Sequence, residues 1–69
     1  MEKQTQRILA YLDAHGSITQ REASEELGVA RLASRICDIR KAGVEIVGVT
    51  ETGYNRFGEV TRYTRYRRL

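Results

Sequence analysis

Five polar side chains lie at helical spacing in the middle of the chain. On a helical wheel of about 100° per residue, they occupy the arc opposite Leu32, Ile36 and Ile39. The five residues are Arg31, Ser34, Arg35, Asp38 and Lys41. An arginine guanidinium presents a planar fork of donors that matches phosphate and the edge of guanine. The pattern therefore favours contact with a nucleic acid, although an ordinary solvated helix face would look similar.

Arg35 and Asp38 have a competing role as partners of each other. They are three residues apart, and a helix-surface ion pair of this kind is worth only about 0.2–0.5 kcal/mol. A bidentate contact from arginine to guanine is worth about 1–3 kcal/mol, so DNA can displace the pair. We expect Arg31 and Arg35 to contact bases, and Asp38 to orient an arginine rather than to accept from cytosine.

A second group of cations follows in the last quarter of the chain. Its members are Arg56, Arg62, Arg65 and Arg67, with Arg68 beside them. Residues 28–69 carry nine cations and four anions, whereas residues 1–27 carry three cations and five anions. This asymmetry indicates a polyanion on one side of the domain; arginine-rich strands that only maintain solubility are the alternative. We expect Arg56 to enter a narrow minor groove, and Arg67 and Arg68 either to follow the backbone or to fray.

Two short helices joined by a tight turn are predicted to position the first group. Thr19 and Glu22 have the T-x-x-E spacing of a capping box, which predicts a helix over residues 19–27. Gly28 then ends that helix, because glycine adopts the left-handed conformation without a steric cost. The second helix is predicted over residues 30–42.

The flanking segments complete a small mixed fold. They predict a helix over residues 3–14, an extended piece at 17–19, strands at 44–50 and 60–66, and a loop at 51–58. Ile8, Tyr11 and Leu12 recur at the spacing of a helix face that packs on a core. Tyr63 and Tyr66 are three residues apart, so we expect one to be buried and the other exposed.

The central run T-Q-R-E-A-S-E-E-L-G-V-A-R-L-A-S-R-I resembles the core of a winged helix-turn-helix domain. The portion R-L-A-S-R-I-x-D-I-R-K-x-G is similar to small domains of this type that bacteriophages and prophages often encode. The resemblance implies an α+β fold of order α-β-α-α-β-β, a three-helix core with a C-terminal β-hairpin as its wing. The sequence departs from the common pattern at Ser24, where alanine is usual, and at Ser34, where an aliphatic residue is usual.

Composition restricts the other classes of function. Sixty-nine residues make one domain, residues 1–69, with one small core. Cys37 is the single cysteine, so no internal disulfide forms, and we expect it to be half-buried in a cytoplasmic protein. His15 has no partner at ligand spacing, so we expect it to interact with a helix end and predict no metal or cofactor. A single histidine and a single cysteine, with the carboxylates on faces expected to be exposed, argue against an enzyme. No apolar run has membrane-spanning length.

These patterns predict sequence-specific binding to double-stranded DNA by a small phage or mobile-element regulator, either a transcriptional repressor or an excisionase-like factor. The helix at 30–42 would enter the major groove, and the wing would contact the adjacent backbone or minor groove. One module binds weakly, so a dimer or a cooperative array on DNA is expected. The location expected is the bacterial nucleoid or the cytoplasm of an infected host.

The alternative is a protein-binding winged helix, such as a phage-encoded inhibitor or adaptor that docks on a host protein. Its interface would consist of the acidic positions Glu22, Glu25 and Glu26 together with exposed tyrosines. The DNA prediction has one structural requirement that the alternative lacks. Leu32, Ile36 and Ile39 must be buried, so that both groups of cations form one continuous positive surface.

Overall fold

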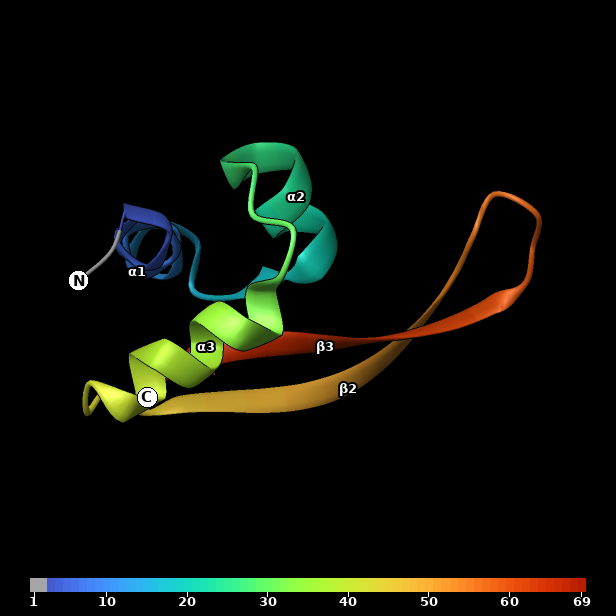
Figure 1. The fold of residues 1–69 in the computed structure, drawn as a ribbon. Coiled ribbons are helices and arrows are strands. Elements are labelled where there is room, and N and C mark those ends of the chain that lie inside the picture. Colours follow the sequence, from blue (N-terminus) through green and yellow to red (C-terminus); the bar gives the residue numbers. More distant parts are fainter. Residues whose placement is uncertain (1–2) are drawn as a thin grey trace.

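The computed structural model describes residues 3–69 and has the predicted α-β-α-α-β-β order (Figure 1). Its elements are α1 (Lys3–His15), β1 (Ile18–Thr19), α2 (Gln20–Leu27), α3 (Leu32–Lys41), β2 (Ile46–Tyr54) and β3 (Val60–Arg68). The predicted α+β winged-helix fold is confirmed. None of the helices in this described part is long and apolar enough to cross a bilayer.

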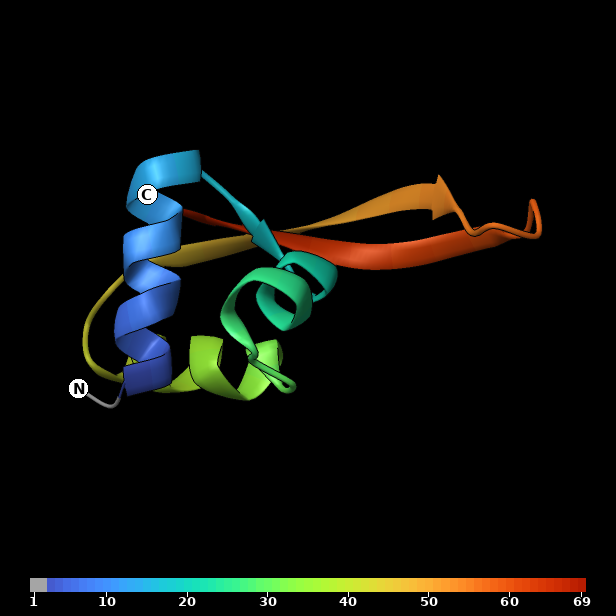
Figure 2. The ribbon, with the colours of Figure 1, turned by 90° about the horizontal axis from the view of Figure 1, so that it is seen from above.

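The three helices gather at one end of a long β-hairpin. The sheet has the order β1-β3-β2, and both strand pairs are antiparallel. Figure 2 shows the outer half of the hairpin projecting past all three helices. The projection makes the molecule elongated, with principal extents of 39 × 22 × 21 Å. We call α1, α2, α3 and β1 the helical body, and residues 54–60 the hairpin tip.

One small core holds the helical body on the base of the hairpin. The predicted stripe of α3 is buried, since Leu32, Ile36 and Ile39 are at most 1% exposed. The other buried hydrophobic residues are Ile8, Leu12, Ile18, Ala23, Val29 and Ile46. Tyr11 only packs against this cluster from outside. The requirement that the α3 stripe face inward is therefore met.

Two residues of α3 lie differently from the prediction. Ala33, which the wheel places beside the core stripe, is exposed, and so is Cys37. Only Leu32, Ile36 and Ile39 of α3 are buried, and α1, α2 and β2 are the elements that pack against the helix. The expectation of a half-buried cysteine was wrong.

The hairpin is longer and its loop shorter than the sequence predicts. β2 continues to Tyr54, so the loop spans only residues 55–59. Gly53, which indicates a loop in the sequence, is covered by a tyrosine ring: a Cβ there would lie 3.3 Å from Cε1 of Tyr63. A glycine beneath a cross-strand aromatic ring is compatible with a regular strand. At the start of β2, the Val44 amide donates to the Ile39 carbonyl of α3 at 3.3 Å. Val44 therefore belongs to the turn that follows α3, and β2 begins only at Ile46.

The two tyrosines of β3 face opposite sides of the sheet, as predicted. The register runs without a bulge from Ile46↔Arg68 to Tyr54↔Val60. Tyr66 is half-buried against the core, whereas Tyr63 is exposed. The inner tyrosine is thus less buried than expected.

The ends of α1 and of β3 differ from the predictions made for them. α1 ends at His15, one residue later than expected, and the His15 ring lies 4.2 Å from the Tyr11 ring between centroids. Arg68 is a regular β3 residue whose Nη1 lies 3.5 Å from Oδ1 of Asp13. The C-terminal arginines therefore do not fray.

Candidate nucleic-acid interface

The predicted capping box forms at the start of α2, the helix that precedes the turn into α3. The Glu22 amide donates to Oγ1 of Thr19 at 3.3 Å, and the Thr19 amide donates to Oε1 of Glu22 at 2.9 Å. Gly28 ends α2 with φ 67°, a left-handed conformation that other residues adopt only with strain. The chain then turns directly into α3, with the Val29 side chain fully buried beneath the turn.

Gln20 positions the start of α3, a role that the sequence does not reveal. Its Oε1 accepts from the Leu32 amide at 2.8 Å, and its Nε2 donates to the Val29 carbonyl at 2.9 Å. Nε2 also lies 2.9 Å from Oγ of Ser24, which gives the hydroxyl at this unusual position a partner. Gln20 thus satisfies a free amide at the helix start, since Arg31, the N-cap residue, makes no side-chain cap bond.

The far end of α3 is tied to the sheet by Arg40. Its Nη2 and Nε donate to the Ile46 carbonyl at 2.9 and 3.2 Å. From the sequence alone, Arg40 would be interpreted as an exposed cation of the helix surface. No sequence pattern predicts its hydrogen bonds to the Ile46 carbonyl. Because both ends of α3 are held, its outer face has a fixed orientation relative to the hairpin.

The predicted reading residues all lie on the outer side of α3 or at its start. Arg31 is exposed but precedes the helix, which begins two residues later than predicted. Ser34 is half-buried, whereas Lys41 is exposed in the last turn. The predicted pair of Arg35 and Asp38 forms, with Nη2 and Oδ2 3.3 Å apart and side chains 30% and 50% exposed. The structure thus places four of the five residues on one short helix, with Arg31 immediately before it.

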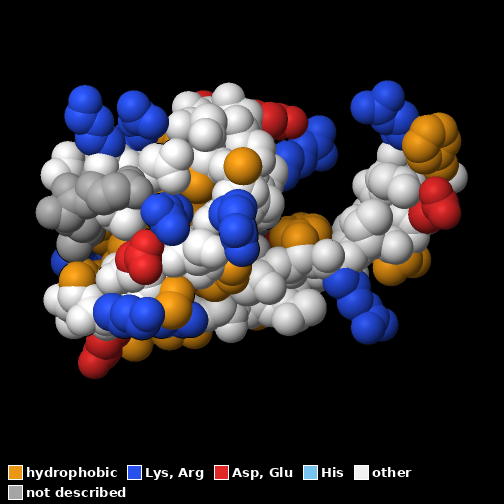
Figure 3. Space-filling view, in the orientation of Figure 1, with side chains coloured by type: hydrophobic (Ala, Val, Ile, Leu, Met, Phe, Trp, Pro, Cys, Tyr) orange, Lys and Arg blue, Asp and Glu red, His pale blue; other side chains and the backbone are white. Residues whose placement is uncertain are grey.

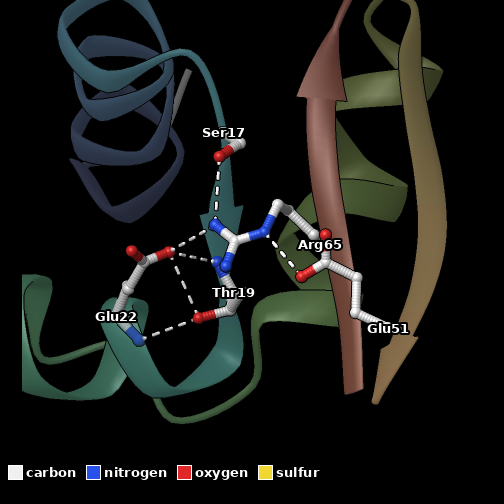
Figure 4. A network of polar contacts seen from close by, with 5 residues as sticks. All are labelled: Ser17, Thr19, Glu22, Glu51 and Arg65. Carbon is white, nitrogen blue, oxygen red and sulfur yellow. Dashed lines mark hydrogen bonds and ion pairs between the residues drawn. The ribbon is translucent and has the colours of Figure 1, made fainter. Parts of the chain in front are cut away.

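The hairpin cations divide into two kinds. Arg56, Arg62 and Arg67 are exposed, Arg56 in the loop and the other two on β3. Arg65 instead points into a polar network between β1, α2 and β2, as Figure 4 shows. Its Nε donates to Oε1 of Glu51 at 2.9 Å, and its Nη1 lies 3.1 Å from Oγ of Ser17. The prediction that Arg65 is a wing cation available to DNA does not fit this position.

The same network changes the interpretation of Glu22. Its Oε1 lies 3.5 Å from Nη1 of Arg65, and the residue is half-buried. Burial and the charges of Glu22 and Glu26 raise the pKa of Tyr11, whose side chain also bonds Glu22. The hydrogen bond from Arg65 lowers the pKa of Glu51 and raises that of Arg65 itself. Glu22 therefore joins the helical body to the hairpin, and the prediction that it belongs to an outward acidic face was wrong.

Positive side chains lie over α3 and on the hairpin, but those of β3 do not share one face. Arg62 and Arg67 are five residues apart in a strand without a bulge, so they point to opposite sides of the sheet. Figure 3 shows Lys and Arg over α3 and on the outer half of the hairpin, with a hollow between the helical body and the hairpin tip. Uncharged surface separates the two groups, and an acidic side chain interrupts the first. The predicted continuous positive surface does not form: from this side, the cations over α3 and those on the outer half of the hairpin are two separate groups.

Within residues 3–69, no group of three or more His, Cys, Asp or Glu side chains could hold a metal ion. A sequence model of the family described as a winged helix-turn-helix domain matches residues 3–67. No curated protein and no solved structure matches the chain. The matched residues include both helices of the turn and nearly all of the hairpin.

Proposed function

The chain belongs to the winged helix-turn-helix domain family, whose general activity is DNA binding, and on that premise we propose that it reads double-stranded DNA in a sequence-dependent way. α3 enters the major groove, and the hairpin follows the adjacent backbone or minor groove. The observation that carries the proposal is the polar side of α3, which is held at both ends and is seen from the same side of the molecule as the cations on the outer half of the hairpin (Figure 3).

Each cation has a distinct part in this proposal. Arg31 stands at the start of α3, the end that helix-turn-helix proteins direct at base edges. Arg35 reaches bases after exchanging its 3.3 Å partner Asp38 for guanine. Lys41, Arg62 and Arg67 neutralise phosphates. Arg65 is left out of the contact set because its guanidinium is engaged by Glu51 and Glu22.

A salt titration tests the electrostatic part of the proposal. With four to six phosphate contacts, log K for a mixed-sequence duplex should fall with log salt at a slope of about −4 to −5. Fluorescence anisotropy at several salt concentrations measures this slope. Absence of binding at low salt would contradict the proposed function.

Two arginine variants separate base reading from backbone contact. We expect Arg31→Ala to weaken the preferred duplex by about 1–3 kcal/mol while leaving mixed-sequence binding little changed. Arg56→Ala should weaken both duplexes alike. Arg7→Ala, which removes an exposed cation of α1 outside both groups, is the matched control. An equal loss on both duplexes for Arg31→Ala would exclude its reading role.

The biological setting that we propose is a small phage or mobile-element regulator in a bacterial cytoplasm, acting as a repressor or as an excisionase-like factor. Its support is the resemblance of the R-L-A-S-R-I-x-D-I-R-K-x-G segment to phage-type domains. Selection of bound duplexes from a random pool identifies the preferred site. Its half-site spacing and the number of shifted bands show whether the protein binds as a dimer or as an array.

The alternative function is docking on a protein. The observation that favours it is the exposure of Glu25 and Glu26 on α2, the acidic positions that remain outward. A Glu25→Lys, Glu26→Lys variant separates the two functions, because it should strengthen non-specific DNA binding but abolish an interaction with a basic protein surface.

A further inference from the structure

The hairpin tip exposes large apolar side chains far from the core. Tyr54, Phe57 and Val60 are 77%, 78% and 62% exposed. Tyr54 and Val60 are paired across the two strands, and Phe57 lies in the loop between them. Figure 3 shows hydrophobic side chains on both sides of the projecting end. Apolar clusters of this kind on a soluble domain usually mark a binding surface.

The loop that carries Phe57 is already ordered by Asn55. The Asn55 Oδ1 accepts from the Phe57 amide at 2.9 Å and from the Glu59 amide at 3.0 Å. Two backbone bonds at 3.0 Å, Asn55 to Glu59 and Gly58 to Asn55, close the same turn. Gly58 supplies the left-handed residue with φ 77°. The Phe57 side chain is therefore presented by a preorganised loop, which loses little conformational entropy on binding.

The stem behind the tip is also suited to pressing that side chain against a partner. β2 and β3 form nine consecutive residue pairs, and the Tyr63 ring lies over Gly53 just below the tip. Arg65 of β3, held by Glu51 of β2, then joins the stem to the helical body through Glu22 of α2. The tip is thus the end of a braced arm rather than of a loose loop.

The charges beside Phe57 favour DNA as the partner. Arg56 is exposed next to it, whereas the carboxylate of Glu59 lies 3.3 Å from Nδ2 of Asn55. A cation next to an aromatic side chain at the end of a narrow hairpin fits the minor groove. There a cation is attracted by the groove potential, and an apolar side chain can separate base pairs.

We infer that Phe57 is a wedge that enters the minor groove and unstacks one base step, so that the protein bends the DNA it binds. This inference rests on the proposed function and deepens it. Arg56 lies in the groove beside the wedge, and Tyr54 and Val60 cover the sugars on either side. The step opened is a flexible pyrimidine–purine step, where unstacking is least costly.

The test uses the full chain and the tightest duplex selected from the random pool. 2-Aminopurine replaces each adenine in turn to report unstacking, and a fluorophore pair at the duplex ends reports bending. At saturating protein, we expect increased 2-aminopurine emission at one step and a bend of about 20–90°. Phe57→Ala should bind about tenfold more weakly, with neither the emission increase nor the bend once saturated.

Two further variants make the outcome decisive. Phe57→Leu keeps an apolar wedge and should retain both signals, whereas Arg56→Ala should weaken binding yet retain them at saturation. Emission and bending that are unchanged in Phe57→Ala, or absent in the wild-type complex, would overturn the wedge and leave a protein partner as the explanation for the apolar tip. If the wild-type chain binds no selected duplex, the proposed function itself fails, which is a different result.

Discussion

Large apolar side chains are buried in the helical body but exposed at the hairpin tip. In the helical body, residues such as Ile8 and Ile36 are at most 1% exposed, whereas Phe57 and Tyr54 at the tip are more than three-quarters exposed. The body is stabilised by burial, and the tip by strand pairing and the bonds of Asn55. Stability and binding are therefore located in different regions, and substitutions should separate them.

The largest effect on stability is expected in the core. Ile36→Ala leaves a cavity beneath α3 and should lower the free energy of unfolding by about 2–5 kcal/mol, a large share of the total for a small domain. Phe57→Ala at the tip should change it by less than about 0.5 kcal/mol. Urea unfolding followed by circular dichroism measures both. A comparable loss for the two variants would mean that the tip is part of the folding unit.

A smaller loss of stability is expected from removing Gln20, which holds the start of α3. Gln20→Ala leaves the Leu32 amide without its side-chain partner and the Val29 carbonyl with only the longer bond from Oγ of Ser24, at 3.4 Å, and should cost about 1–3 kcal/mol. Gln20→Glu keeps the acceptor for Leu32 but loses the donor to Val29, so its loss should be intermediate. Amide exchange at Leu32 follows the start of the helix directly. Unchanged exchange in Gln20→Ala would show that Gln20 does not position α3.

The features of the fold that the sequence predicts correctly are those that depend on residues close together in the chain. The capping box of Thr19 and Glu22, the left-handed Gly28 and the buried stripe of α3 all follow from spacings of a few residues. Each depends on local geometry that one helix imposes by itself. The order of elements follows from the same signals.

The contacts that were not predicted join residues distant in sequence. Gln20 reaches Leu32, and Arg65 reaches Glu51 and Ser17. Charge patterns assign an arginine of a terminal strand to solvent or DNA, because they contain no information on which side chains the register brings within reach. The prediction of a loop at Gly53 was wrong for a related reason, since the ring that covers it comes from the opposite strand.

At the tip, Asn55 tests whether local order is independent of the body. Asn55→Ala removes the acceptor of the Phe57 and Glu59 amides, so both should exchange faster, by a factor that corresponds to about 1 kcal/mol. Global stability should stay within about 0.5 kcal/mol of the wild type. Asn55→Asp retains the acceptor oxygen and should protect both amides. Faster exchange across α3 in Asn55→Ala would instead show that tip and body unfold together.

The weakest expected effect is a pH dependence at the junction of the two regions. The Arg65 hydrogen bond holds the pKa of Glu51 below its ordinary value, although partial desolvation opposes this. A lowered folded-state pKa means that the pair stabilises the fold above the unfolded-state pKa and that this stability is lost as pH falls through the folded-state pKa. Wild-type stability should consequently fall more steeply than that of Glu51→Gln as the solution becomes acidic. Glu25→Gln, which breaks only the exposed pair with Arg21, should follow the wild type. Equal slopes for all three chains would show that the Glu51–Arg65 pair does not contribute to the pH dependence of stability.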